Sequence, residues 1–533
     1  MALDRWFPAQ TLTGQEQMLL RRLGRVRKLL GFLRLHRSEL IDDAFQTTLE
    51  GMYRSTGAGR PPVPPGMMAM AMLVQGYLGV SDAELIELTV VDLRVQMVLG
   101  RLGETKPPFS QGAFHDFRAR MIRADLDQKL LAKTVELARS SKEFDFKRLP
   151  KNLRVAVDSS PLEGAGRVED TINLLAHAAR KVVESAAHVL GWPVERACVE
   201  AGIPLLQYPS AKRALDIDWN DDTLKADALR KLVAQLDSLQ AWLAQVLPNE
   251  CNAPPLKDQL ETLKQIREQD LEPDPEGGGS RIRRGVAQDR RISVEDSAMR
   301  HGRKSTARRF DGYKRHIAAD LDHGLIVACT VTPANQPEHE ALPQLHDELL
   351  EQGFTIQDLY IDRGYISSPI VDDVVASHGT IFCKPWQTQN GALFAKSDFK
   401  LDLRARTITC PAGQTMPVRL GTTVMFDAAT CDRCPQRQRC TDARPGTPRS
   451  VWINANEPLQ QRLRKHIKSP SWREQLRRRV AVEHHLAHIS QRQGNRARYF
   501  GIRKNLFDLR RAASIQNLEV LHRASSAAHR KAA

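Results

Sequence analysis

The sequence predicts an α/β protein built on a mixed β-sheet with flanking helices. Short apolar runs of strand type occur at residues 155–157, 313–332, 359–361 and 380–384, and two of them end on an aspartate. Helical patterning instead dominates the first 145 residues and about a hundred residues beyond position 171. With 533 residues, the chain is long enough for about two to four domains.

The N-terminal region is expected to be entirely helical. An apolar run at residues 67–78 predicts one helix. Ser81 and Glu84 have the spacing of a capping box, which predicts a second helix beginning at Asp82, and Ser110 is the expected cap of a third. Two short helices around a tight turn indicate either a helix-turn-helix that enters a DNA groove or an ordinary helical bundle.

A carboxylate is predicted at the end of the first buried strand. Asp158 follows the apolar run at 155–157, and Ser159, Ser160 and Pro161 are expected to lead the chain away from the sheet. An acid on a rigid element is accessible to a cation or a substrate. Taken alone, however, an Asp at this place is more often a strand cap.

The segment after this acid is predicted to be a helical insertion. Helical patterns begin at Ile172 and again at Leu229, with almost no strand signal between them. Residues 272–280 are rich in Pro, Gly and charge, and we interpret them as a linker.

Strand patterning then returns and leads to a second acid. A hairpin is predicted from residues 313–318 and 325–332, followed by a helix at 338–352 and an apolar strand that ends on Asp362. This order places Asp158 and Asp362 on neighbouring central strands of the mixed sheet.

Four cysteines close together predict a structural zinc site. They lie within 31 residues and include a CxxC pair: Cys410, Cys431, Cys434 and Cys440. Four thiolates fill the tetrahedral shell of Zn²⁺, and the strand-like segment at 416–426 suits a zinc ribbon. The alternative is a set of reduced thiols on a loop. The remaining cysteines are isolated and are expected to be buried as small apolar side chains: Cys198, Cys251, Cys329 and Cys383.

A third candidate acid lies on a helix predicted at residues 472–491. Glu483 shares the spacing of Val480 and Ala487, which places its carboxylate on the inward, apolar stripe. Burying an unpaired carboxylate is costly, and Arg479 one turn earlier is a candidate partner. Three histidines nearby lack the HExxH order of zinc proteases.

The net charge of +15 is concentrated in two tracts. Residues 462–511 contain 15 Lys and Arg against three acids, and residues 280–315 contain 12 against four. Such tracts suit a polyanion such as DNA, whereas diffuse positive charge usually serves only solubility.

The sequence favours a soluble protein of the reducing cytoplasm. Eight cysteines are too few and too unevenly spread for a disulfide framework, and the first ten residues lack the apolar core of a secretory signal. No run approaches 18 uninterrupted apolar residues, so we expect no membrane span.

The order of these segments resembles the DDE transposases of bacterial insertion sequences, which have an RNase H-like catalytic core. The resemblance rests on the MLVQGYLGVSD stretch, VDSSPLEGAGRVEDT, FDGYKRHIAAD, IDRGY, the cysteine cluster and RRRVAVEHHLAHISQRQGNRARYFGIRKN. Each motif alone is unspecific, whereas their order along the chain is specific.

The resemblance implies that Asp158, Asp362 and Glu483 are catalytic and bind two divalent cations, usually Mg²⁺. Hard cations prefer oxygen ligands, and two of them stabilise both the attacking and the leaving oxygen of a phosphodiester. Water would attack first and free a 3′-hydroxyl at the element end, and this hydroxyl would then attack target DNA. The implied partners are DNA and a second copy of the chain in the active complex, in the bacterial cytoplasm at the nucleoid.

The resemblance also implies a division of the chain and a set of DNA contacts. The divisions are a helical DNA-binding domain at 1–148, a catalytic core at 149–170 and 280–400, the helical insertion at 171–279, a zinc-ribbon-like insertion at 401–455, and core helices with a basic tail at 456–533. The expected DNA contacts are Arg479, Arg492, Arg496, Arg498, Arg503 and Lys504.

The sequence departs from a pattern that related transposases often carry, Tyr-x2-Arg-x3-Glu-x6-Lys. Arg479 and Glu483 fit it, but Leu476 stands at the Tyr position and Ser490 at the Lys position. Arg492 is the candidate replacement for the missing Lys as a phosphate contact.

Two other functions remain open. One is an RNase H-like nuclease that cuts DNA without joining it, and the other is a catalytically inactive, transposase-derived DNA-binding protein. The presence of all three acids argues against the inactive protein.

Overall fold

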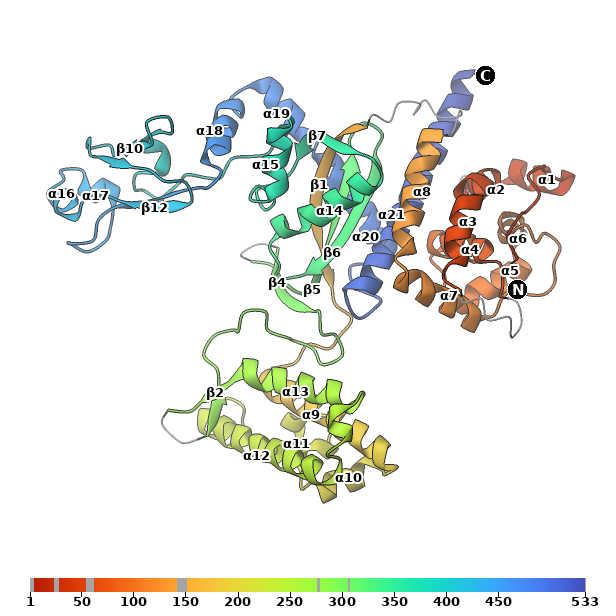
Figure 1. The fold of residues 1–533 in the computed structure, drawn as a ribbon, viewed down its shortest axis with the longest axis horizontal. Helices are drawn as coiled ribbons and strands as arrows, with labels where there is room; N and C mark the ends of the chain where they lie inside the picture. The colour runs from red at the N-terminus through yellow and green to blue at the C-terminus, as the bar shows by residue number, and fades with distance from the viewer. Residues whose placement is uncertain are drawn as a thin grey trace.

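The computed structural model describes residues 4–23, 28–53, 62–140, 151–275, 279–304 and 307–532, with side chains up to residue 526. Three lobes surround a central sheet (Figure 1). The N-terminal helices lie on one side of the sheet, the arm that contains the clustered cysteines lies on the opposite side, and the helical insertion extends from one end. The α/β class predicted from the sequence is confirmed.

The N-terminal lobe is helical, as expected. Its helices are α1(Gly14–Arg22), α2(Lys28–Leu40), α3(Asp43–Glu50), α4(Pro65–Leu78), α5(Asp82–Val91), α6(Leu93–Leu99), α7(Gln111–Arg123) and α8(Leu126–Ser140). The Ser81 side chain accepts a hydrogen bond from the Glu84 amide, and Ser110 accepts one from the Ala113 amide. Both predicted helix starts are therefore confirmed, since each hydroxyl satisfies an amide that the first turn leaves without a partner.

Helix packing explains the pair of helices α4 and α5 better than a DNA-reading motif does. The first eleven residues of α4 are all buried. Helix α5, which would enter the groove, contains no Lys or Arg and exposes Glu84 and Glu87. Because exposed acids repel phosphates, the helical-bundle alternative is favoured. In the described part of the chain, no helix combines the length and the apolarity needed to cross a membrane.

The central sheet has six strands and mixed directions. They are β1(Asn152–Glu163), β4(Arg300–Arg303), β5(Arg309–Asp320), β6(Leu325–Pro333), β7(Thr355–Tyr360) and β8(Thr380–Phe382). Strand β5 lies between β1 and β6, and it is antiparallel to both. Strand β7 runs parallel to β1 on the other side and is followed by the parallel strand β8, while β4 pairs with the start of β5.

Helices cover both faces of this sheet. On one face, α14(Leu342–Glu351) and α15(Pro369–Ala376) share a core with Val155 and Val157 of β1. On the other face, α20(Val480–Gln493) packs with Ala156 of β1 and Ile317 of β5. The near-continuous apolar strands follow from burial on both sides.

The helical insertion has a core of its own. Its elements are α9(Thr171–Leu190), α10(Val194–Glu200), η1(Pro204–Gln207), α11(Ala211–Leu215), α12(Asp222–Val246), η2(Glu250–Asn252) and α13(Leu256–Asp270). The linker interpretation of residues 272–280 is wrong at both ends, because β2(Leu271–Pro273) pairs with β3(Ser280–Ile282). Residues 276–278 between these strands lie outside the described residues.

The cysteine arm consists of short strands and two short helices around a small core. It begins near η4(Lys396–Asp398), and its elements are β9(Lys400–Asp402), β10(Thr407–Thr409), β11(Thr415–Pro417), β12(Thr422–Met425), α16(Ala428–Asp432), α17(Arg437–Cys440) and β13(Ser450–Ile453). The strands β9 to β11 form one sheet, and β12 pairs with β13. The helices α18(Glu457–His466) and α19(Pro470–Arg477) lead back to the central sheet.

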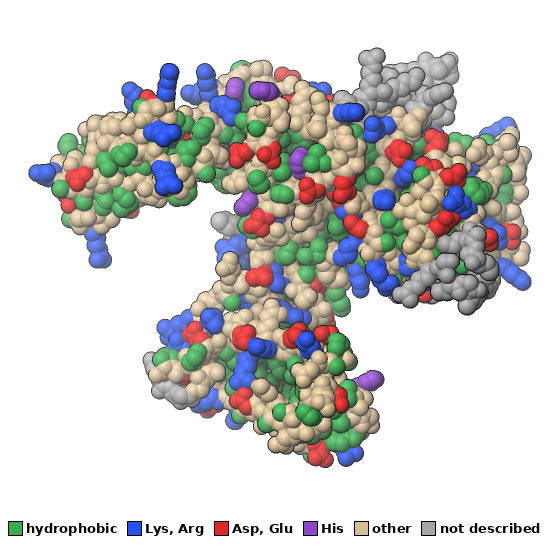
Figure 2. Space-filling view, in the orientation of Figure 1, with side chains coloured by type: hydrophobic (Ala, Val, Ile, Leu, Met, Phe, Trp, Pro, Cys, Tyr) green, Lys and Arg blue, Asp and Glu red, His purple; other side chains and the backbone are tan. Residues whose placement is uncertain are grey.

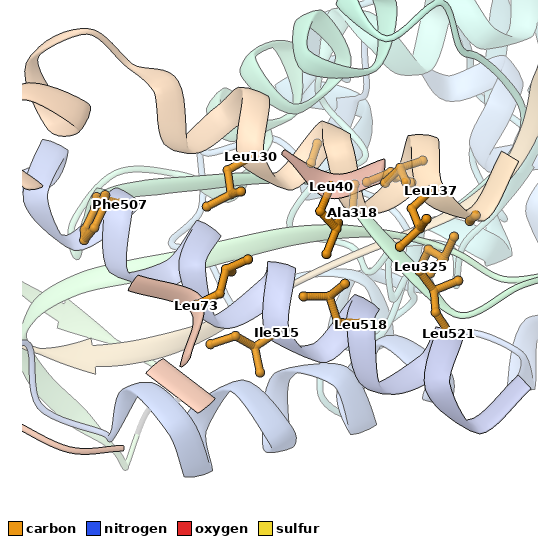
Figure 3. Close-up of a cluster of buried hydrophobic side chains, with 14 of the residues drawn as sticks. Leu40, Leu73, Leu130, Leu137, Ala318, Leu325, Phe507, Ile515, Leu518 and Leu521 are labelled. Atoms are coloured by element: carbon orange, nitrogen blue, oxygen red, sulfur yellow. The ribbon is translucent and has the colours of Figure 1, made fainter. Parts of the chain in front are cut away.

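One long helix, α21(Ile502–Ala532), joins the sheet to the N-terminal lobe. Figure 3 shows the core that it shares with both. The labelled side chains are Leu40, Leu73, Leu130, Leu137, Ala318, Leu325, Phe507, Ile515, Leu518 and Leu521. They come from α2, α4, α8, β5, β6 and α21, so a single apolar core connects the first helices of the chain to the sheet.

Truncating Leu518 tests this shared core. The side chain is fully buried, so Leu518→Ala removes packed methyl groups and leaves a cavity. We expect the free energy of unfolding to fall by about 2–5 kcal/mol, measured by urea denaturation. Leu350→Ala makes the same chemical change at a side chain that is 47% exposed, and it should cost less than about 1 kcal/mol. Equal losses in the two variants would contradict the shared core.

Candidate active site

The two predicted aspartates occupy equivalent places on neighbouring parallel strands. Ala156 of β1 is paired with Tyr360 of β7, and Asp158 and Asp362 each follow two residues later. Pairing between β1 and β7 ends at this point, so both carboxylates lie where the two strands separate.

The expectation that Asp158 ends its strand is wrong on one side of β1. Strand β1 continues to Glu163 and stays paired with β5, with Asp158 opposite Ile317. The apolar run stops at Val157, but hydrogen bonding to a neighbouring strand does not require apolar side chains. Pro161 is tolerated because β7 no longer pairs with this part of β1.

Glu483 reaches this place from helix α20, although not as predicted. The single helix expected at 472–491 is two helices, α19 and α20. A turn at Arg478 and Arg479 joins them. In α20, Val482 and Leu486 face the core while Glu483 remains 49% exposed. The carboxylate therefore faces the cavity at the sheet end instead of an apolar stripe.

Arg479 connects two of the three acids. Its Nη1 donates to Asp158 Oδ2 at 2.8 Å, and its Nη2 donates to Glu483 Oε1 at 2.7 Å. The predicted partnership of Arg479 with Glu483 is thus present and extends to Asp158. Two carboxylates share one guanidinium, which relieves part of their mutual repulsion.

Burial raises the pKa of Asp158 to about 6. Its side chain is only 14% exposed, and the negative charge of Asp362 acts in the same direction. The Arg479 guanidinium and the Ser159 amide lower the pKa but do not compensate for burial. At neutral pH such a carboxyl is mostly ionised in a setting that disfavours its charge, which favours a bound cation.

The three acids line one cavity of about 750 Å³. Basic side chains at its wall are Arg303, Lys304 and Lys314. A second cavity of about 880 Å³ shares Asp362 and Glu483 with the first. Its basic lining residues are Arg363, Lys384, Arg473, Arg477 and Arg479. The acids thus have basic side chains on both sides, in excess only in the second cavity, where a polyanion could bind.

Much of the concentrated basic charge is used within the protein. Figure 2 shows Lys and Arg side chains scattered over one face, with acids between them. Ion pairs in the two tracts include Arg281–Glu272, Arg290–Asp270, Arg300–Asp289, Arg464–Glu457, Arg478–Asp322, Arg510–Glu348 and Arg511–Asp508. The sequence therefore overstates the positive charge that is available to a ligand.

Some of the predicted DNA contacts are likewise paired within the protein, and others are exposed. Arg492 pairs with Glu519, and Arg503 pairs with Asp127. Arg496 donates to the carbonyl oxygens of Gly164 and Ala165 at 3.3 Å. Two further predicted contacts, Arg498 and Lys504, are exposed. Arg479 lies among the acids.

The four clustered cysteines line one cavity of about 340 Å³ in the arm. Cys410 lies in a tight turn in which the Gln414 amide donates to its Sγ at 3.3 Å, and the Cys434 amide donates to the Cys431 carbonyl. Of the other four cysteines, Cys198, Cys329 and Cys383 are buried as expected and Cys251 is half-buried.

Neither cluster has its ligands drawn together around a point. Within the described ranges, no group of three or more His, Cys, Asp or Glu side chains is placed so that it could hold a metal ion. At the acids, Arg479 supplies the positive charge between Asp158 and Glu483. The donor set nevertheless fits a divalent cation of the Mg²⁺ type, since every candidate ligand is a carboxylate oxygen at one cavity.

One further carboxylate in this cavity was missed in the sequence. Glu338 lies at the start of η3(Glu338–Ala341), directly after β6, and accepts a hydrogen bond from the Ser159 hydroxyl. Its position after Pro337 in a polar stretch gives no pattern that marks it as functional. Gly364, two residues beyond Asp362, is the available signal, because this glycine makes room for Glu338.

Two parts of the chain match known protein families. Residues 29–120 match the family described as transposase domain (DUF772), and residues 409–522 match the family described as transposase DDE domain. Both matches support an insertion-sequence DDE transposase. The second match contains Glu483 and the four clustered cysteines, while Asp158 and Asp362 lie outside both matches. No curated protein and no solved structure matches the chain.

The two matches bear on the ligands to be expected. Proteins of this kind act on DNA and use divalent metal ions. The acids and basic side chains that line the two cavities are consistent with both properties.

The raised pKa of Asp158 predicts a pH-dependent cost to stability. Because the folded-state pKa of about 6 exceeds the ordinary value of 3.8, the native state binds the proton more tightly, and stability falls as pH rises through 6. Asp158→Asn should raise the free energy of unfolding by about 1–3 kcal/mol at pH 8, with the gain vanishing near pH 4. Urea denaturation in EDTA at each pH measures this free energy of unfolding.

The exposed Asp372 gives the matched control. Asp372→Asn should leave the pH profile of stability unchanged. An Asp158→Asn variant whose stability is unaltered between pH 4 and pH 8 would contradict the buried-carboxylate account.

Proposed function

We propose that this transposase cleaves DNA at the ends of its insertion sequence and joins the freed ends to target DNA. The observation that carries the proposal is the meeting of Asp158, Asp362 and Glu483 at one cavity although they are far apart in sequence. Water attacks the phosphodiester at the element end, and the released 3′-hydroxyl then attacks a phosphodiester of the target. Neither step requires a covalent link to the protein.

The strand order supports an RNase H-like catalytic core. The order β6-β5-β1-β7-β8 has only β5 antiparallel to the rest, with helices on both faces. In this arrangement the acids gather where the pairing of β1 with β7 ends. We infer that residues 149–170, 280–400 and 456–533 build this core, while residues 171–279 and 401–455 are insertions.

The three carboxylates are proposed to hold two Mg²⁺ ions. Bound Mg²⁺ supplies Lewis-acid stabilisation of the attacking and leaving oxygens. The chain itself contributes the position of each carboxylate, fixed by β1, β7 and α20, and the guanidinium of Arg479 at their centre. A cation bound at Asp158 and Glu483 would neutralise both partners of Arg479. The guanidinium could then turn toward a phosphate.

The basic linings of the two cavities are the proposed DNA path. Arg303 and Lys304 on one side, and Arg473 and Arg477 on the other, can contact phosphates that flank the scissile bond. Among the residues predicted from sequence, Arg498 and Lys504 are exposed and suit sequence-independent contacts. We propose structural rather than DNA-binding roles for Arg492 and Arg503.

Glu483→Gln tests the proposed chemistry. The variant keeps the size of the side chain and removes its charge, so cleavage of a duplex that carries the element end should fall at least about 100-fold in Mg²⁺. DNA affinity, measured by fluorescence anisotropy, should change little. Glu474→Gln, an exposed acid on α19, is the matched control and should cut normally.

Two results would contradict the proposal. Wild-type cleavage by Glu483→Gln would remove this residue from the site. Pre-cut ends that are never joined to target DNA would favour the nuclease that cuts without joining.

We also propose that the cysteine arm holds one structural Zn²⁺. Cys410, Cys431, Cys434 and Cys440 line a single cavity and would leave no open position for water. Purified protein should contain about one zinc per chain, lost in the Cys431→Ser/Cys434→Ser variant, as measured by plasma mass spectrometry. Cys251→Ser, in the helical insertion, should retain the metal. Zinc-free wild type with unchanged stability would overturn the assignment.

A further inference from the structure

A fourth carboxylate, Glu338, lines the cavity of the three acids. Asp158 and Ser159 are successive residues of β1, so their side chains point to opposite faces of the sheet. Asp158 meets Arg479 and Glu483 on the α20 face, while Ser159 donates its hydroxyl to Glu338. Glu483 and Glu338 thus approach the end of the sheet from opposite faces.

Gly364 makes the approach of Glu338 possible. A Cβ at this position would lie 2.1 Å from Glu338 Oε2 and 3.1 Å from Asp362 Oδ1. Gly364 is not among the glycines with a positive φ, so conformational freedom does not explain it. The glycine of the Asp-Arg-Gly-Tyr segment provides space for a carboxylate beside Asp362.

A buried network fixes Ser159, the hydrogen-bond donor to Glu338. Tyr365 interacts with Ser159, and its hydroxyl lies 2.6 Å from His316 Nδ1. The other ring nitrogen of His316 lies 2.9 Å from Thr332 Oγ1. Because His316 and Tyr365 are fully buried, this arrangement holds the Glu338 carboxylate in a defined place.

Glu338 carries a charge that the described residues do not neutralise by contact. Among them, no Lys, Arg or His forms an ion pair with it, and the nearest recorded hydrogen bond is that from Ser159. Lys314 and Arg479 both influence it electrostatically. The Lys314 ammonium, however, donates to the Gln336 carbonyl at 2.8 Å, and Arg479 pairs with Asp158 and Glu483. A half-buried carboxylate without an ion pair, facing another carboxylate, is costly unless a cation joins them.

The geometry points to Glu338 as a fourth carboxylate ligand of the cation site, contributing an oxygen beside Asp362 on the face opposite Glu483. This inference rests on the proposed function, because it adds a residue to that site. Glu338 would bind the cation directly, while Ser159 and Gly364 position it.

Mn²⁺ binding to the full-length protein without DNA tests the assignment independently of catalysis. Free Mn²⁺ is followed by electron paramagnetic resonance during a titration. Glu338→Gln should weaken Mn²⁺ binding by at least about tenfold. The matched control is Glu340→Gln, which changes an exposed acid on the same short helix and should bind Mn²⁺ like the wild type.

Gly364→Ala provides a second test, because it replaces none of the acidic residues. The added methyl should displace Glu338 and weaken Mn²⁺ binding by a similar factor. Circular dichroism checks that each variant is folded. Should Glu338→Gln or Gly364→Ala fail to fold, Ser159→Ala replaces it as the test, because this variant removes the hydrogen bond that holds the Glu338 carboxylate. Wild-type Mn²⁺ affinity of the Ser159→Ala variant would then overturn the inference.

Asp158→Asn separates failure of this inference from failure of the proposed function. If Asp158→Asn loses Mn²⁺ binding while Glu338→Gln retains wild-type affinity, only the assignment of Glu338 is wrong. If wild type and Asp158→Asn bind Mn²⁺ equally, or neither binds it, the cation site itself is wrong and the inference falls with it.

Discussion

The guanidinium of Arg479 makes it possible for acids to gather at one end of the sheet. Carboxylates at close range repel one another, and burial of Asp158 adds to that cost. Arg479 donates hydrogen bonds to both Asp158 and Glu483 from the turn between α19 and α20. The apolar residues Val482, Leu486 and Ile489 hold α20 on the sheet, and Arg479 bonds the two carboxylates that this position brings together.

The site also depends on elements that contribute no acid. Helix α21 packs against β6 on one side and against α8 and α4 on the other. The buried Arg510 pairs with Glu348 of α14 and Asp127 of α8, so the same helix ties both lobes together by charge. A buried network of this kind fixes relative position more than it adds stability, since desolvation offsets most of the Coulomb attraction.

The sequence predicted the elements well and their junctions poorly. Strand patterns located β5, β6 and β7, and local capping located the starts of α5 and α7, because these features depend on neighbouring residues. The continuation of β1 beyond Asp158 depends on pairing with β5, about 150 positions away in the chain. The break before Arg479 has no Pro or Gly to mark it. Glu338 was missed because only tertiary structure brings it beside Asp362.

Helix α21 follows all the other described elements along the chain, which matters during synthesis. The ribosome makes the N-terminal helices and the first strand long before Glu483 and α21 are available, whereas the helical insertion can close its own core early. The sheet and the N-terminal lobe therefore expose apolar surface until the final helix emerges. We expect a chain that stops before α21 to leave this shared core open, although the helical insertion can fold.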